Sequence, residues 1–160
     1  MSLSETTLAD TSKAPATSAA KKPATVFVDG GSGTTGLGIN ERLKHQNDVV
    51  VKTLPDDKRK DPVAKKALME EVDLVILCLP DDAARETVAL VDSMGAHAPK
   101  VLDASTAYRV APDWAYGFPE LTPDQAGKIK TAKKVSNPGC YPTGARIPPP
   151  APRCSTTPTR

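Results

Sequence analysis

The sequence predicts an α/β fold, specifically a doubly wound parallel sheet. Short apolar runs rich in Val, Ile and Leu alternate with stretches whose apolar residues recur at helical spacing. This alternation is typical of parallel strands joined by right-handed helical crossovers. The first apolar run is followed by a glycine-rich loop, residues 30–36, and then by a helical pattern. Strand, glycine loop and helix in this order are what a Rossmann-like, dinucleotide-binding unit requires.

The expected strands and helices follow from periodicity and turn signals. Apolar β-rich runs predict strands over residues 24–29, 49–51, 73–79, 100–103 and 133–136. Helical spacing predicts helices after the glycine loop, over 63–71, around 84–94, in a short stretch near Thr122, and from Cys140 onward. Asp61-Pro62 is a good helix start, because Asp can cap the helix and Pro suits its first position.

We expect one domain, residues 25–145, with a tail at each end; a chain of 160 residues is near the usual domain size of roughly 100–150. Residues 1–24 are mostly Ser, Thr, Ala and Lys, which predicts a disordered tail. Residues 146–160 are rich in proline, and each proline inside a helix costs about 3 kcal/mol. We therefore expect disorder there and an aberrant terminus, such as a frameshift produces.

Composition excludes several classes of function. The net charge of +2 gives no electrostatic case for binding nucleic acid or an anionic membrane. No apolar run approaches the roughly 20 residues of a membrane span. Three cysteines make neither a disulfide framework nor a CxxC zinc site, and nothing resembles a secretory signal. We expect a cytoplasmic, reducing setting.

The glycine loop is the candidate cofactor site. Gly31-x-Gly33-x-x-Gly36 matches the dinucleotide fingerprint, and Gly30-x-x-Gly33-x-x-Gly36 overlays it. Glycines let the backbone approach a pyrophosphate, whose charge sits at the helix N-terminus. A glycine-rich turn without a ligand is the alternative.

The end of the second strand favours NADP over NAD. An NAD site usually has Asp or Glu there, to bind the ribose 2′-hydroxyl. This chain has Lys52-Thr53-Leu54 instead, with more cations at 58–60. Lys52 and Arg59 are the candidate ligands of a 2′-phosphate, and a solvated basic loop is the alternative for either one.

Cys140 is the candidate nucleophile, within the turn Asn137–Gly144. A turn that opens a helix can activate a cysteine, because free N–H groups and the helix dipole favour the thiolate. A structural thiol is one alternative. A phosphatase loop is another, since Cys140 and Arg146 have C-x₅-R spacing, but the usual preceding histidine and following Ser/Thr are absent. Cys78 is expected in the core, and Cys154 in the tail.

Arg109 is a cation that could bind a phosphate through its fork of donors. An ion pair with Glu120 or Asp103 is the alternative. His45 and His97 are expected to be solvated rather than catalytic, because one falls at a predicted helix end and the other in a loop.

Six motifs, in order over about residues 25–145, resemble the N-acetyl-gamma-glutamyl-phosphate reductases of arginine biosynthesis in their shorter form. The motifs are Val28–Leu37, Arg59–Pro62, Cys78–Glu86, Asp103–Val110, Tyr116–Leu121 and Asn137–Gly144. The aspartate-semialdehyde dehydrogenases are more distant relatives and the nearest alternative family. The Tyr116–Leu121 motif and Pro138-Gly139 favour the first family.

The resemblance implies an NADP-dependent oxidoreductase. The Cys140 thiolate would attack the acyl carbonyl of N-acetyl-gamma-glutamyl phosphate and expel phosphate, and hydride from NADPH would reduce the thioester to the semialdehyde. The residues implied to bind the cofactor are Gly30, Gly31, Ser32, Gly33, Thr34, Thr35, Gly36, Leu79 and Pro80. Those implied on the substrate side are Ser105, Arg109 and Asn137, of which Asn137 would shape the turn beneath Cys140.

The family continues beyond its cysteine into an α+β domain, which supplies a general-base histidine and the homo-oligomer contact. No such segment is recognisable after Gly144 here. We therefore expect a cofactor-binding fragment with little turnover, and a non-catalytic NADP-binding module is the alternative.

Overall fold

Six parallel strands form one sheet in the computed structural model, which describes residues 22–146. The strands are β1 (Ala24–Asp29), β2 (Val49–Lys52), β3 (Leu74–Leu77), β4 (Lys100–Asp103), β5 (Ala115–Tyr116) and β6 (Lys134–Ser136). Their order across the sheet is β2-β1-β3-β4-β6-β5, and every neighbouring pair is parallel. The predicted doubly wound α/β fold is thus confirmed.

Helices connect the strands. They are α1 (Thr34–Lys44), α2 (Pro62–Glu70), α3 (Asp81–Asp92), α4 (Gln125–Thr131) and α5 (Cys140–Arg146), with 3-10 turns at Asp56–Lys58 and Gly95–His97. The start of α2 is as predicted, since the Asp61 carboxylate accepts a hydrogen bond from the Val63 N–H at 2.9 Å. Among residues 22–146, no helix combines the length and apolar character needed to cross a membrane.

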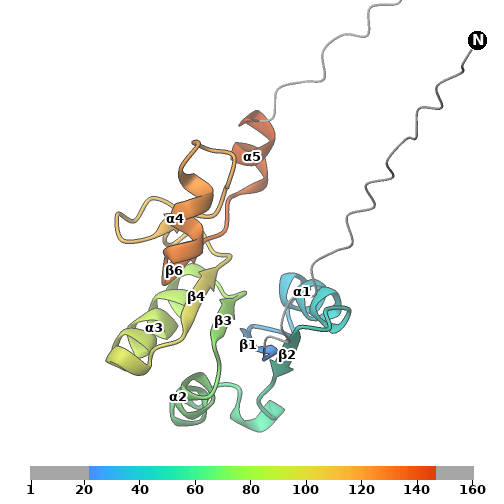
Figure 1. Ribbon diagram of the computed structural model, residues 1–160. Helices are drawn as coiled ribbons and strands as arrows, with labels where there is room; N and C mark the ends of the chain where they lie inside the picture. Colours follow the sequence, from blue (N-terminus) through green and yellow to red (C-terminus); the bar gives the residue numbers. More distant parts are fainter. Residues whose placement is uncertain (1–21, 147–160) are drawn as a thin grey trace, which may run out of the picture.

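The two faces of the sheet pack against different helices (Figure 1). On one face, Phe27, Val75 and Leu77 are buried together with residues of α2 and α3. On the other face, Val26, Val28 and Ile76 pack against α1. Because helices cover both faces of the sheet, side chains that point to either face are buried. This is why the strand sequences are apolar almost throughout.

Some boundaries differ from expectation. The third strand ends at Leu77, two residues earlier than predicted, and Cys78 and Leu79 form the turn that leads to α3. Arg146 closes α5, although we placed it in the disordered tail. The remainder of the two predicted tails, residues 1–21 and 147–160, lies outside the described residues.

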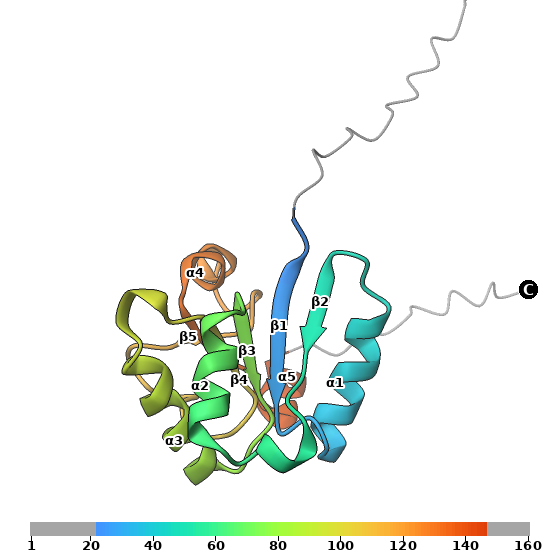
Figure 2. The same ribbon diagram turned by 90° about the horizontal axis from the view of Figure 1, so that it is seen from below.

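Because all strands are parallel, their carboxyl ends share one edge of the sheet, where α5 also begins (Figure 2). Backbone hydrogen bonds continue past the strands at this edge. The Cys78 N–H donates to the Asp29 carbonyl at 2.8 Å, Ala104 N–H to Leu77 at 3.0 Å, and Asn137 N–H to Asp103 at 2.7 Å. These bonds fix the loops after β1, β3, β4 and β6 relative to one another.

Candidate functional site

A cleft of about 730 Å³ lies where the winding of the sheet reverses. The chain passes from β1 to β2 on one side and then returns to β3 on the other, and such a switch point is where open α/β sheets bind ligands. The residues lining the cleft come from the glycine loop, the segment after β2, and the start of α3. They include Gly30, Gly31, Ser32, Thr53, Leu54, Arg59, Lys60, Lys65, Leu79, Ala83 and Glu86.

Of the two overlapping glycine patterns, Gly30-x-x-Gly33-x-x-Gly36 contains the two glycines that the conformation of the loop requires, Gly30 and Gly36. Gly30 has φ +81°, and a Cβ there would lie 2.3 Å from the carbonyl oxygen of Cys78. A Cβ on Gly36 would lie 2.3 Å from the Gly30 carbonyl oxygen and 2.6 Å from the Gly31 Cα. Gly30 therefore provides the tight turn, and Gly36 allows α1 to approach the loop closely.

The N-terminus of α1 is open to an anion. Gly33 occupies the capping position, no side chain caps the helix, and its first turn contains no acidic residue. The backbone N–H groups of Thr34, Thr35 and Gly36 belong to a first turn that has no intrahelical acceptors. Such groups, together with the helix dipole, favour a phosphate, so the loop fits a dinucleotide pyrophosphate.

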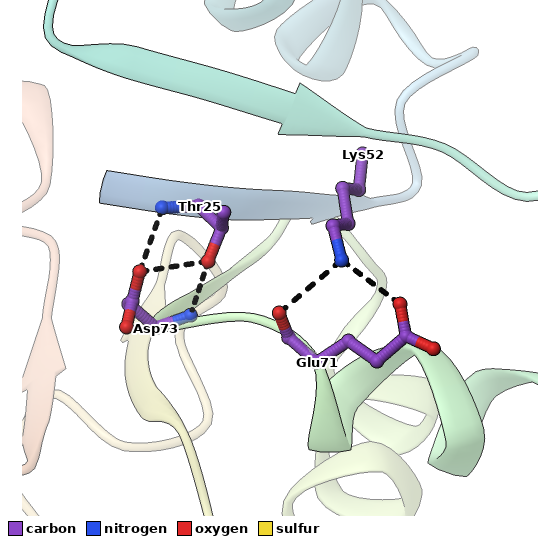
Figure 3. A network of polar contacts seen from close by, with 4 residues as sticks. All are labelled: Thr25, Lys52, Glu71 and Asp73. Carbon is purple, nitrogen blue, oxygen red and sulfur yellow. Dashed lines mark hydrogen bonds and ion pairs between the residues drawn. The ribbon is translucent and has the colours of Figure 1, made fainter. Parts of the chain in front are cut away.

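Of the two candidate ligands of a 2′-phosphate, one lines the cleft and the other does not. Arg59 lines the cleft, and its ion pair with Asp56 (2.6 Å) is exposed. Lys52 does not line it; its ammonium forms a 2.8 Å ion pair with Glu71, as Figure 3 shows. That pair holds the pKa of Glu71 below its usual value. The cause is strand alternation, because Lys52 pairs in register with Phe27 and shares the face covered by α2.

A buried ion pair in the cleft was not foreseen from the sequence. The Asp29 carboxylate, at the end of β1, accepts from Lys65 at 2.7 Å and from the Thr87 hydroxyl at 3.3 Å. Asp29 is 6% exposed, and Lys65 lines the cleft. The pair joins β1 to α2 and α3. The only signal in the sequence was an acid directly before a glycine loop.

Cys140 is the first residue of α5 and is exposed. The turn before it is held by the Asn137 N–H, which donates to the Asp103 carbonyl. Thr143 donates to the Gly139 carbonyl through its N–H (3.1 Å) and its hydroxyl (2.8 Å), closing the first turn of the helix. Asn137 itself is exposed, and its amide donates to the Pro138 carbonyl at 3.3 Å. The thiol is thus accessible at the carboxyl edge of the sheet.

The Ser105–Arg109 loop lies between the glycine loop and Cys140 along this edge. Ser105 is buried, and both its N–H (3.1 Å) and its hydroxyl (2.6 Å) donate to the Asp103 carboxylate. The Ser105 oxygen also accepts from the Ala107 N–H at 3.1 Å. The Ser105 hydroxyl therefore shapes the loop. Arg109 forms no ion pair with Glu120, with Asp103 or with any other acid among residues 22–146, and its buried Nε has no acceptor there.

Two aromatic rings anchor the far side of this loop. Tyr108 stacks on Trp114 with ring centroids 4.3 Å apart and an interplanar angle of 14°. Arg85 of α3 lies over the Tyr108 ring at 5.6 Å, and Lys134 lies over Trp114 at 5.8 Å. Spacing in the sequence gave no indication of this stack.

The remaining candidates take no part in the cleft. Cys78 is half-buried in the turn after β3 and packs against the α1-side core; burial raises the pKa of its thiol, and the Asp29 and Asp103 carboxylates raise it further. His45 caps the C-terminus of α1 and His97 lies in the turn before β4. Both positions are at the amino ends of the parallel strands, opposite the edge that bears Cys140.

A glycine loop at a switch point and an exposed cysteine on the same edge define a dinucleotide-binding domain of an oxidoreductase. Residues 25–129 match the family model described as "Semialdehyde dehydrogenase, NAD binding domain", and the chain belongs to this family. The resemblance predicted from the motifs is confirmed by curated relatives. The chain is 52% identical to N-acetyl-gamma-glutamyl-phosphate reductase of Burkholderia lata over 76% of its own length, and 56% identical to that of Trichormus variabilis over 74%.

The chain spans little more than a third of these relatives, 38% and 36% of their lengths. Among solved structures, aspartate semialdehyde dehydrogenase from Francisella tularensis has the same fold. Its TM-score is 0.57 at 17% identity, over 71% of this chain and 36% of that one.

Proposed function

We propose that this chain is the cofactor-binding part of an NADP-dependent acyl-phosphate reductase that acts on N-acetyl-gamma-glutamyl phosphate. One observation carries the proposal. A glycine loop that accommodates a pyrophosphate lies on the same edge of the sheet as an exposed cysteine, and the loop between them carries Arg109, which forms no ion pair within residues 22–146. The names of the curated relatives supply the substrate.

In the proposed reaction the Cys140 thiolate attacks the acyl carbonyl carbon. A carbon–sulfur bond forms, the bond from that carbon to the phosphate oxygen breaks, and phosphate leaves with the electron pair. This covalent capture divides one difficult step into two easier ones. When bound, a nicotinamide would supply a hydride to the thioester carbon, and the carbon–sulfur bond would then break to release the semialdehyde and the Cys140 thiolate. Arg109 is suited to the substrate phosphate because its buried Nε has no acceptor within residues 22–146.

The 160-residue chain by itself is expected to bind NADPH and to be acylated at Cys140 without sustained turnover. Its two histidines, the usual general bases, lie at the opposite edge of the sheet from the cysteine. We propose a cytoplasmic setting for this chemistry, in line with the sequence, whose three cysteines make no disulfide framework.

The test is to expose the chain to N-acetyl-gamma-glutamyl phosphate and to locate the acyl adduct by mass spectrometry. The wild-type chain and Cys78→Ser should be acylated, and Cys140→Ser should not. All three should bind NADPH equally in a fluorescence titration, since neither cysteine lines the cleft. Acylation of Cys140→Ser, or a wild-type chain that does not bind NADPH, would contradict the proposal.

A second titration tests the 2′-phosphate ligand. Arg59→Gln should weaken NADPH binding by roughly tenfold or more, as loss of a charge-assisted hydrogen bond does, and should leave NADH binding unchanged. Lys52→Gln is the matched control, because the Lys52 ammonium is paired with Glu71. Equal losses in the two variants would show that general positive charge, rather than Arg59, selects NADPH.

A further inference from the structure

The loop that carries Arg109 is attached to the cofactor side of the site by one carboxylate. Asp81, the first residue of α3, accepts hydrogen bonds from both the N–H of Thr106 (2.9 Å) and its hydroxyl. The two residues are 25 positions apart in the chain. Such two-point attachment to a charged acceptor is stronger than bonds between neutral groups and also fixes orientation.

Asp81 is placed between the two halves of the site. Leu79, two residues before it, lines the cofactor cleft. Arg109, three residues beyond Thr106, lies close enough to Asp81 to contribute, after Thr106 and Arg85, to holding the pKa of that carboxyl below its usual value. One acidic side chain, two residues after Leu79, therefore binds the Ser105–Arg109 loop and lies near the arginine proposed to bind substrate.

We propose that Asp81 is a positioning residue for the reductase, which holds the Ser105–Arg109 loop so that Arg109 presents its guanidinium to the phosphate of the substrate. This inference rests on the proposed function, since it assumes that Arg109 binds that phosphate. Asp81 is a hydrogen-bond acceptor for Thr106 and has no contact with substrate in this role. Asp103 and Ser105 anchor the other end of the loop, so loss of Asp81 should loosen the Thr106–Arg109 half only.

The experiment measures the affinity of the 160-residue chain for inorganic phosphate, by calorimetry, in the presence of saturating NADPH. Asp81→Asn and Thr106→Val should each weaken phosphate binding roughly tenfold, the loss expected from a hydrogen bond to a charged group. The loss in the double variant should be smaller than the sum of the two single losses, because both changes remove the bond from the Thr106 hydroxyl to the Asp81 carboxylate, while the Thr106 N–H is kept. Thr106→Ser should bind phosphate as the wild type does, because it keeps both donors.

Controls separate positioning from general effects. Asp82→Asn removes the same charge from the same helical turn, but the Asp82 carboxylate has no hydrogen bond or ion pair within the described residues, so it should leave phosphate binding unchanged. NADPH affinity should be unchanged in every variant. A loss in Asp82→Asn equal to that in Asp81→Asn would overturn the inference, as would wild-type affinity in Thr106→Val.

Arg109→Gln distinguishes failure of this inference from failure of the proposed function. If Arg109→Gln loses phosphate binding and Asp81→Asn does not, Asp81 has no positioning role while the substrate site stands. If Arg109→Gln retains wild-type affinity for phosphate, the proposed substrate site is wrong, and the role of Asp81 falls with it.

Discussion

The packing of α1 against the glycine loop predicts opposite effects for two glycines of the same helix. Gly36→Ala adds a methyl group that would meet the Gly30 carbonyl oxygen at 2.3 Å and the Gly31 Cα at 2.6 Å. Gly38→Ala adds the same group two residues later, where nothing lies within 4 Å. Both changes remove a glycine from α1, so helix propensity favours both by about 1 kcal/mol.

The magnitudes follow from what the new methyl group displaces. At Gly36 the obstructing atoms belong to the backbone. Overpacking of this kind typically costs roughly 1–3 kcal/mol, and it costs more where the obstructing atoms cannot move. Because backbone atoms cannot rotate away, the upper end of this range applies, and net of the propensity gain Gly36→Ala should lower the free energy of unfolding by about 2 kcal/mol or more. Gly38→Ala should raise it by about 1 kcal/mol, which is roughly 4 °C in Tm for a domain of this size.

The assay is urea unfolding followed by circular dichroism, paired with NADPH titration. Gly36→Ala should also lose most NADPH affinity, because the methyl group can be accommodated only if the loop moves away from the N-terminus of α1. Gly38→Ala should bind NADPH as the wild type does. If Gly36→Ala is as stable as Gly38→Ala and binds NADPH equally well, the close approach of α1 to the loop is wrong.

Two further predictions concern charged contacts. Lys65→Met should destabilise the fold by about 3–5 kcal/mol, the cost of leaving a buried carboxylate such as Asp29 without its partner, whereas Lys66→Met, which breaks no ion pair in the described part of the chain, should change Tm little. Hydrogen bonds from the N–H and the hydroxyl of Thr25 hold the pKa of Asp73 below its usual value. The stabilisation from this contact is therefore complete above about pH 5 and is lost as the pH falls through the lowered pKa. Acid titrations of Tm should show a smaller loss between neutral pH and pH 3 in Thr25→Val, and an identical acid dependence in that variant would contradict the assignment.

The order of the helices and of five of the six strands could be predicted because its signals are local, whereas the two-residue strand β5 (Ala115–Tyr116) was not predicted. The run Val26-Phe27-Val28, the Asp61 cap and the glycine loop each act within a few residues. Cys140 at a helix start was predictable for the same reason. The least certain feature was the length of each strand: the apolar run that begins at Leu74 continues past Leu77 into the turn, and periodicity alone cannot locate that bend.

The contacts that complete the site could not be predicted, because they join distant segments. Asp29 and Lys65 are 36 residues apart in the chain, and Asp81 and Thr106 are 25 apart. The sequence has several cationic residues near the end of β2. Which of these side chains faces the cleft depends on the direction in which each one points. Strand alternation turns Lys52 toward Glu71 (Figure 3), and Arg59 lies beyond the strand, where this constraint no longer applies.

The strand order of the sheet determines the distance between the two halves of the proposed site, the glycine loop and the turn before Cys140. β6 is the third strand from β1, and strands are spaced about 4.8 Å apart, so the turn before Cys140 lies roughly 14 Å along the edge from the glycine loop. A cofactor bound by its phosphates at α1 has to extend past the ends of β3 and β4 to reach the cysteine. The loops at those two ends, represented by Leu79 and Thr106, are the ones that Asp81 connects. The position of Asp81 between them explains why a partly exposed carboxylate that does not contact the substrate should affect the binding of substrate.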